Sequence, residues 1–163
     1  MTQNRPSIDS VAEVTEPFPV YLKGKVVKGF GRGSKDLNIP TANYPSEVIK
    51  EQFLNKLDLG IYYGYSKVSG VKEGVLPMVM SVGWNPFYNN TEKSAEVHII
   101  HNFENDFYDH QLSTVVLGYV RAEKSYESLD ALIADIKFDI QFALNSLELP
   151  LFKPYLEDKF FKD

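Results

Sequence analysis

Six short runs rich in β-branched and aromatic residues, followed by one run with helical periodicity, most constrain the fold of this chain. Gly, Pro, Asn or Asp separates the runs, which cover residues 21–29, 39–44, 60–68, 76–82, 95–100 and 115–121. Strand-like runs at this spacing are typical of a small barrel. We therefore expect an all-β fold with an added helix: a six-stranded antiparallel barrel. A weaker pattern at 46–57 predicts one short helical piece.

The helical run begins near Ser128, a good N-cap, and ends at Pro150. Its apolar residues recur at intervals of three and four, which predicts one long amphipathic helix packed outside the sheet. They are Leu129, Leu132, Ile133, Ile136, Ile140, Ala143, Leu144 and Leu147. We expect one domain over 1–163, with a loosely ordered tail at 1–19, the barrel at 20–127, and the helix with an aromatic C-terminal cover at 128–163.

Composition excludes several classes of protein. The net charge of −5 argues against general nucleic-acid binding, which needs a basic surface. Cysteine is absent, so the chain has neither disulfides nor thiolate chemistry. No apolar run is long enough to span a membrane, and residues 1–19 resemble no secretory or mitochondrial signal. We expect a cytoplasmic monomer that binds neither nucleic acid nor membranes.

A glycine-rich segment between the first two strand-like runs is the first candidate site. Alternating glycines bring bare backbone N–H groups, and then a cation, close to an anion, which suits phosphate. The residues are Gly29, Gly31, Gly33, Ser34 and Lys35. The segment is not a Walker A loop, because it lacks that motif's Lys-Ser/Thr pair after its glycines. A turn that binds nothing is the commoner alternative for such glycines alone.

A few residues beyond this segment, Pro40 is followed by Thr41, Ala42 and Asn43. Thr41 and Asn43 are the candidate metal ligands. Two residues apart in an extended chain, they share one face. Uncharged oxygen ligands side by side suit a hard cation such as Mg²⁺, which takes its other ligands from water and phosphate. We therefore predict a nucleotide phosphate and metal site here.

Glu96 is the candidate catalytic base. In the strand-like run 95–100 it shares a face with His98, while the opposite face is apolar, so a rigid element holds the carboxylate. A solvent-facing glutamate on a half-exposed strand is the alternative. His98 and His101 lie three apart, on opposite faces of a strand, and are not expected to bind zinc together.

Taken in order, several motifs resemble the riboflavin kinase (flavokinase) family. They are Gly29–Lys35 with Pro40-Thr41-Ala42-Asn43, Gly60–Gly64, Ser81–Pro86, Glu96-Val97-His98 and Gly118–Arg121. The resemblance implies a Greek-key barrel with a helix outside. It also implies transfer of the γ-phosphate of ATP to the ribityl 5′-hydroxyl of riboflavin, giving FMN and ADP. We expect the monofunctional form, because 163 residues leave no room for a fused adenylyltransferase.

The resemblance also assigns roles to residues. The ATP phosphates would be lined by Gly29, Gly33, Ser34 and Lys35. Thr41 and Asn43 would bind ATP together with Mg²⁺. Zn²⁺ or another divalent ion is an open alternative to Mg²⁺. Glu96 would activate the flavin hydroxyl, and Arg121 with the loop after it would close over the flavin.

Three other functions fit parts of the pattern. A non-catalytic nucleotide- or flavin-binding module would keep the glycines and aromatic residues without needing Glu96. A small barrel that binds nucleic acid or protein is disfavoured by the acidic charge. An ATPase would release ADP without riboflavin.

Overall fold

The computed structural model describes residues 17–27, 41–52, 56–70, 72–84, 93–101, 109–123 and 126–162. The glycine-rich segment, with Gly29, Gly33, Ser34 and Lys35, lies outside the described residues, as does most of the predicted tail 1–19.

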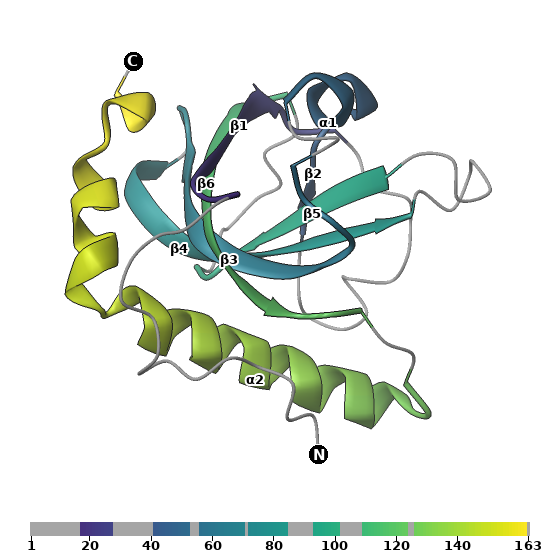
Figure 1. Ribbon diagram of the computed structural model, residues 1–163. Helices are drawn as coiled ribbons and strands as arrows, with labels where there is room; N and C mark the ends of the chain where they lie inside the picture. The colour runs from purple at the N-terminus through teal and green to yellow at the C-terminus, as the bar shows by residue number, and fades with distance from the viewer. Residues whose placement is uncertain are drawn as a thin grey trace.

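Six antiparallel strands within these ranges form one sheet (Figure 1). They are β1 (Val20–Lys25), β2 (Ala42–Asn43), β3 (Gly60–Val68), β4 (Lys72–Trp84), β5 (Lys93–Ile99) and β6 (Gln111–Arg121). The spatial order is β1-β6-β3-β4-β5-β2. Because β6 returns beside β3, the strands β3 to β6 form a Greek key. The predicted six-stranded Greek-key architecture is confirmed.

A single bridge brings the two edges of this sheet together. Beyond β1, Val27 forms an antiparallel bridge with Asn43, and its N–H donates to the Asn43 carbonyl at 2.9 Å. The sheet thereby curls into a barrel in which β2, only two residues long, lies between β5 and the chain that follows β1.

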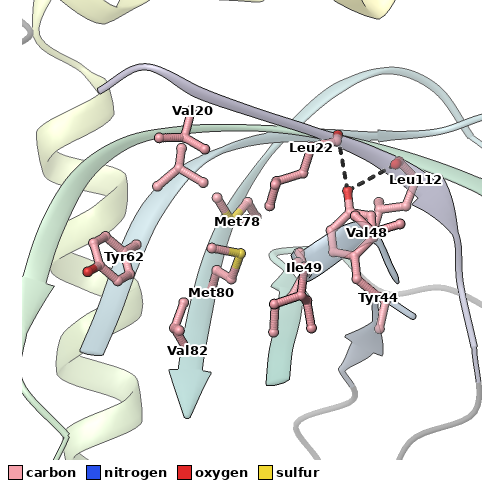
Figure 2. Close-up of a cluster of buried hydrophobic side chains, with 14 of the residues drawn as sticks. Val20, Leu22, Tyr44, Val48, Ile49, Tyr62, Met78, Met80, Val82 and Leu112 are labelled. Atoms are coloured by element: carbon pink, nitrogen blue, oxygen red, sulfur yellow. Dashed lines mark hydrogen bonds between the residues drawn. The ribbon is translucent and has the colours of Figure 1, made fainter. Parts of the chain in front are cut away.

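The barrel interior holds one apolar core, and alternate residues of each strand point into it (Figure 2). The short helix α1 (Ser46–Gln52) closes one end with Val48 and Ile49. It packs so closely on β1 that a Cβ at Gly24 would lie 2.5 Å from Val48 Cγ2. The Tyr44 hydroxyl, also inside, lies 2.9 Å from the Leu112 carbonyl oxygen and 2.8 Å from Thr114 Oγ1.

A second apolar core lies on the outside, between the sheet and the C-terminal part of the chain. Helix α2 (Leu129–Leu147) runs across the barrel, and the 3₁₀ segments η2 (Pro150–Glu157) and η3 (Lys159–Phe161) continue beside it (Figure 1). Ser128 caps α2 by accepting the Ala131 N–H at 3.1 Å. The tail is fixed by Phe152 and Phe161, which are buried.

The buried face of α2 differs from the predicted apolar stripe. The fully buried residues are Asp135, Asp139, Ala143, Ser146 and Leu147, and only two of these belong to the stripe. Leu129, at its start, is 56% exposed. The helix is rotated because two carboxylates turn inward to meet a buried arginine, an interaction that apolar periodicity does not register.

Candidate active site

Three of the sequence-predicted residues meet on the outer face of β2 and β5. Asn43 pairs with Glu96, and Ala42 pairs with Val97. Since Ala42 and Val97 belong to the barrel core, their neighbours Asn43 and Glu96 face outward. The Thr41 hydroxyl donates to Glu96 Oε1 at 3.4 Å, which joins positions 55 residues apart in sequence.

Asn43 carries a buried amide oxygen with no hydrogen-bond partner in the described part of the chain. The residue is only 4% exposed. Leaving such an atom unpaired costs about 1–3 kcal/mol. Beside it lie a hydroxyl and a carboxylate, and this all-oxygen set is what a hard divalent cation prefers. The residues present therefore fit a metal ion that shares its shell with a ligand.

The strand β5 holds Glu96 rigidly. Its neighbours Ala95 and Val97 are each 1% exposed, whereas Glu96 and His98 are half-buried on the opposite face. β5 is paired on one side by β2 and on the other by β4, where Ser81 lies opposite Glu96. The Glu96 carboxylate therefore keeps a fixed position relative to the side-chain oxygens of Thr41 and Asn43.

The same outer row continues across the sheet toward β6. Ser81 pairs with Ile61, and Ile61 pairs with Arg121. Three strand spacings thus separate Glu96 from Arg121, roughly 14 Å. Arg121 does not lie beside Thr41, Asn43 and Glu96.

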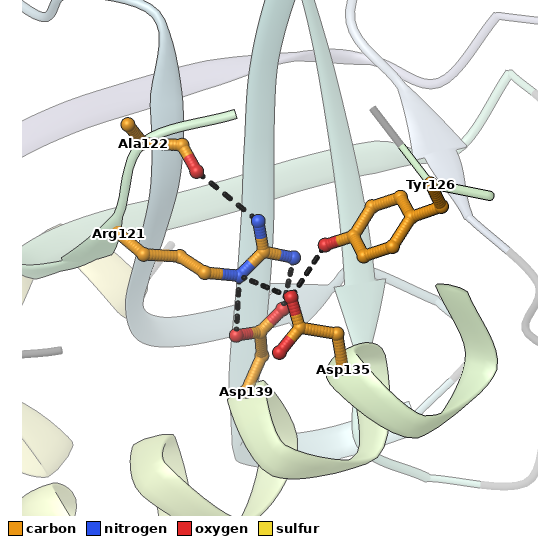
Figure 3. Close-up of polar contacts among 5 residues, drawn as sticks. All are labelled: Arg121, Ala122, Tyr126, Asp135 and Asp139. Carbon is orange, nitrogen blue, oxygen red and sulfur yellow. Dashed lines mark hydrogen bonds and ion pairs between the residues drawn. The ribbon is translucent and has the colours of Figure 1, made fainter. Parts of the chain in front are cut away.

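The guanidinium of Arg121 turns instead toward α2, where it joins a buried cluster (Figure 3). Its Nε and Nη2 donate to the two carboxylate oxygens of Asp139 at 2.9 and 2.8 Å. Asp135 Oδ2 lies 3.4 Å from Nε, and Nη1 donates to the Ala122 carbonyl at 3.1 Å. The Tyr126 hydroxyl donates to Asp135 at 2.5 Å. We call Arg121, Tyr126, Asp135 and Asp139 the arginine cluster.

Burial and charge fix the protonation states in this cluster. Burial lowers the pKa of Arg121, but the hydrogen bonds and charge of Asp139 outweigh it, so the net change is upward. Burial raises the pKa of Tyr126 well above its ordinary value, and the hydrogen bond to Asp135 raises it further. Tyr126 therefore remains a neutral donor, and Arg121 remains a cation.

Comparison with known proteins decides the family. The family model described as riboflavin kinase matches residues 16–147. The chain belongs to the riboflavin kinase family. It is 47% identical to the riboflavin kinase of Homo sapiens over 89% of this chain and 92% of that protein. It is 45% identical to that of Pyricularia oryzae, over 94% and 84%.

A solved structure leads to the same family. The crystal structure of riboflavin kinase from Trypanosoma brucei matches with a TM-score of 0.71 and 29% identity, over 89% of this chain and 90% of that one. The predicted family, fold and activity, ATP-dependent phosphorylation of riboflavin to FMN, are confirmed. Riboflavin kinases use a divalent metal in this reaction. Among the described residues, no helix is long and apolar enough to cross a bilayer.

Sequence reasoning missed most of the arginine cluster of this riboflavin kinase. Asp135 and Asp139 are four residues apart, and hence on one face of the helix, inside an otherwise apolar run. That spacing was a usable signal of a buried partner. The direct contact of Arg121 with the flavin stays a prediction, but its guanidinium is already held by α2.

Proposed function

We propose that this riboflavin kinase transfers phosphate on the outer face of β2 and β5, where Thr41, Asn43 and Glu96 meet. The observation that carries the proposal is the contact of Thr41 Oγ1 with Glu96 Oε1, because it sets the predicted metal ligands next to the predicted base. Phosphoryl transfer asks a protein mainly to align its substrates and neutralise charge, so this proximity is what the reaction needs.

Thr41 and Asn43 would bind Mg²⁺ together with ATP. The unpaired, buried Oδ1 of Asn43 supports this role, since a cation would supply its missing partner. When bound, the metal neutralises charge on the phosphates. Residues 29–35 precede Thr41 with only residues 36–40 between them, and we assign Gly29, Gly33, Ser34 and Lys35 to the phosphates. Mg²⁺ is our choice over Zn²⁺ because the donors are oxygens.

Glu96 would take the proton from the 5′-hydroxyl of the ribityl chain as the phosphate arrives. Its carboxylate contacts Thr41, which keeps one oxygen directed toward β2 and the metal side. The acceptor hydroxyl would then approach between Glu96 and the bound phosphate. A base placed in this way typically contributes about 10²- to 10⁴-fold to the rate.

The test is Glu96→Gln, which keeps the side-chain volume and removes the basicity. We expect kcat for FMN formation to fall by about 10²- to 10⁴-fold, with the KM for ATP nearly unchanged. His98→Gln is the matched control, because His98 lies on the same face of β5, and it should keep wild-type activity.

A narrower role for Glu96 gives a different pattern. If the carboxylate only orients the hydroxyl, Glu96→Gln keeps much of its activity and Glu96→Ala loses more, because a loose transition state needs little deprotonation. Wild-type turnover in both variants, with the fold intact, would remove Glu96 from the mechanism.

We also propose that the chain acts as one domain over 1–163, as a cytoplasmic monomer, with neither nucleic acid nor membranes as partners. The outer core supports the single domain, since α2 and the C-terminal tail share it with β3 and β6. The net charge of −5 supports the exclusion of nucleic acid. Sedimentation of the purified protein would test the monomer.

A further inference from the structure

The geometry points to a positioning role for the arginine cluster: it holds Ala122 and Glu123, which follow β6, so that Glu123 lies over the outer face of β4 and forms part of the riboflavin side of the active site. The inference rests on the proposed function of Thr41, Asn43 and Glu96. It gives Arg121 an action through its neighbours in addition to the predicted contact with the flavin, and it adds Glu123 as a residue that faces the riboflavin.

The order of the strands separates the two substrates. Asn43 lies on β2 and Thr41 directly precedes that strand, at one side of Glu96. A base must reach both the acceptor hydroxyl and the space next to the transferred phosphate. With ATP and the metal on the β2 side, the rest of the acceptor extends over the other neighbour of β5, which is β4.

The chain after β6 reaches this part of β4. The carboxylate of Glu123 lies over the outward position of Gly83, where a Cβ would come 2.8 Å from Glu123 Oε1. Ser81 pairs with Glu96, and Gly83 is the next outward residue along β4. Gly83 is therefore a diagonal neighbour of Glu96, about 7–8 Å away.

The two carboxylates differ in what they can do. Glu96 is placed to accept the proton of the reacting hydroxyl. Glu123, one diagonal spacing further from β2, is placed to accept hydrogen bonds from other hydroxyls of a polyhydroxylated chain. The ribityl group of riboflavin is such a chain.

The arginine cluster holds both ends of the connection between β6 and α2. Arg121 fixes the outgoing end through Asp139 and through the Ala122 carbonyl. Tyr126 fixes the incoming end through Asp135, and its ring lies 5.8 Å from the guanidinium carbon. Arg121 is 5% exposed and each aspartate 2%, so these contacts are shielded from water.

The primary test is Asp139→Asn, which keeps the shape and removes one charge of the cluster. Steady-state FMN formation should show a riboflavin KM raised by about 10- to 100-fold, as expected when a substrate contact is misplaced. The KM for ATP should stay within about twofold of wild type. Tyr126→Phe, which removes only one hydroxyl, should fold readily and move the riboflavin KM in the same direction by less.

The route through Glu123 has its own test. Glu123→Gln should raise the riboflavin KM without lowering the melting temperature. In the double variant with Asp139→Asn, the two effects on riboflavin KM should be less than additive, because both act on the same carboxylate. Full additivity would overturn the role of Glu123.

Leu147→Ala is the matched control for a merely structural effect. Leu147 is buried at the other end of α2, so its truncation destabilises the same helix without touching the arginine cluster. We expect a lowered melting temperature and an unchanged riboflavin KM. Equal riboflavin KM changes in Leu147→Ala and Asp139→Asn, or none in Asp139→Asn and Tyr126→Phe, would refute the inference. Neither result would change the loss of activity expected in Glu96→Gln. The proposed function and the positioning role of the arginine cluster can therefore fail independently.

Discussion

Replacing Asn43 by Leu tests the metal site through stability as well as activity. Asn43 Oδ1 is buried without a hydrogen-bond partner in the described residues. Its desolvation costs about 1–3 kcal/mol, a cost that an apolar side chain of similar size does not carry. For a chain of this length 1 kcal/mol corresponds to about 2–4 °C in Tm. Without nucleotide, the variant should melt at the wild-type temperature or several degrees above it.

Mg²⁺ and ATP should then separate the two proteins. Ligand at 100 times its Kd stabilises a folded protein by about 2.7 kcal/mol, which is about 5–11 °C here. Wild type should gain this shift in differential scanning fluorimetry, and Asn43→Leu should lose most of it together with FMN formation. Thr41→Val, which also removes one oxygen, should lose part of the shift.

Thr114→Val supplies the opposite pattern as a control. The Thr114 hydroxyl is buried but paired, 2.8 Å from both the Tyr44 hydroxyl and Ser66 Oγ. Its removal should cost about 1–3 kcal/mol and leave the Mg²⁺-ATP shift intact. If Asn43→Leu instead lost as much stability as Thr114→Val, or kept the full shift, the metal-ligand assignment would be wrong.

Two further predictions concern tyrosines in the barrel. Gly118→Ala should destabilise the protein by about 1–3 kcal/mol in chemical denaturation, because its Cβ would overlap the end of the Tyr63 ring. Wild-type stability would show that the Tyr63 ring can move aside. Burial raises the pKa of Tyr62 and of Tyr65 from 10.0 to about 12. Their contribution to stability is therefore complete below pH 10 and is lost as the pH rises toward 12. Unfolding free energies measured over this range should decline, with a smaller decline in Tyr62→Phe, and a flat profile would contradict the raised pKa values.

Local pattern was sufficient to predict most of the fold. The run 60–68 coincides with β3, because β-branched and aromatic residues are bounded there by a glycine and a turn. Ser128 was correctly predicted to cap α2, since a cap depends only on its nearest neighbours. The rotation of α2 was not predictable in this way, because it depends on Arg121, which precedes the helix and binds two of its carboxylates.

The site was predictable only in part. The outward direction of Glu96 follows from strand alternation, and the side-by-side placement of Thr41 and Asn43 follows from their spacing. Their proximity to Glu96 depends on the pairing of β2 with β5, a long-range contact that no local pattern specifies. The roles of these residues came from the family resemblance. The position of Glu123 over Gly83 had no sequence signal.

The bridge between Val27 and Asn43 gives the metal site a second property. The backbone of Asn43 closes the barrel, while its side chain is the proposed metal ligand. β2 has only two residues, so few ladder hydrogen bonds oppose local opening at this edge. Binding and local opening are then thermodynamically linked, because a ligand bound to Asn43 favours the closed edge. If the proposed site is right, Mg²⁺ and ATP should reduce the hydrogen exchange of the Val27 amide.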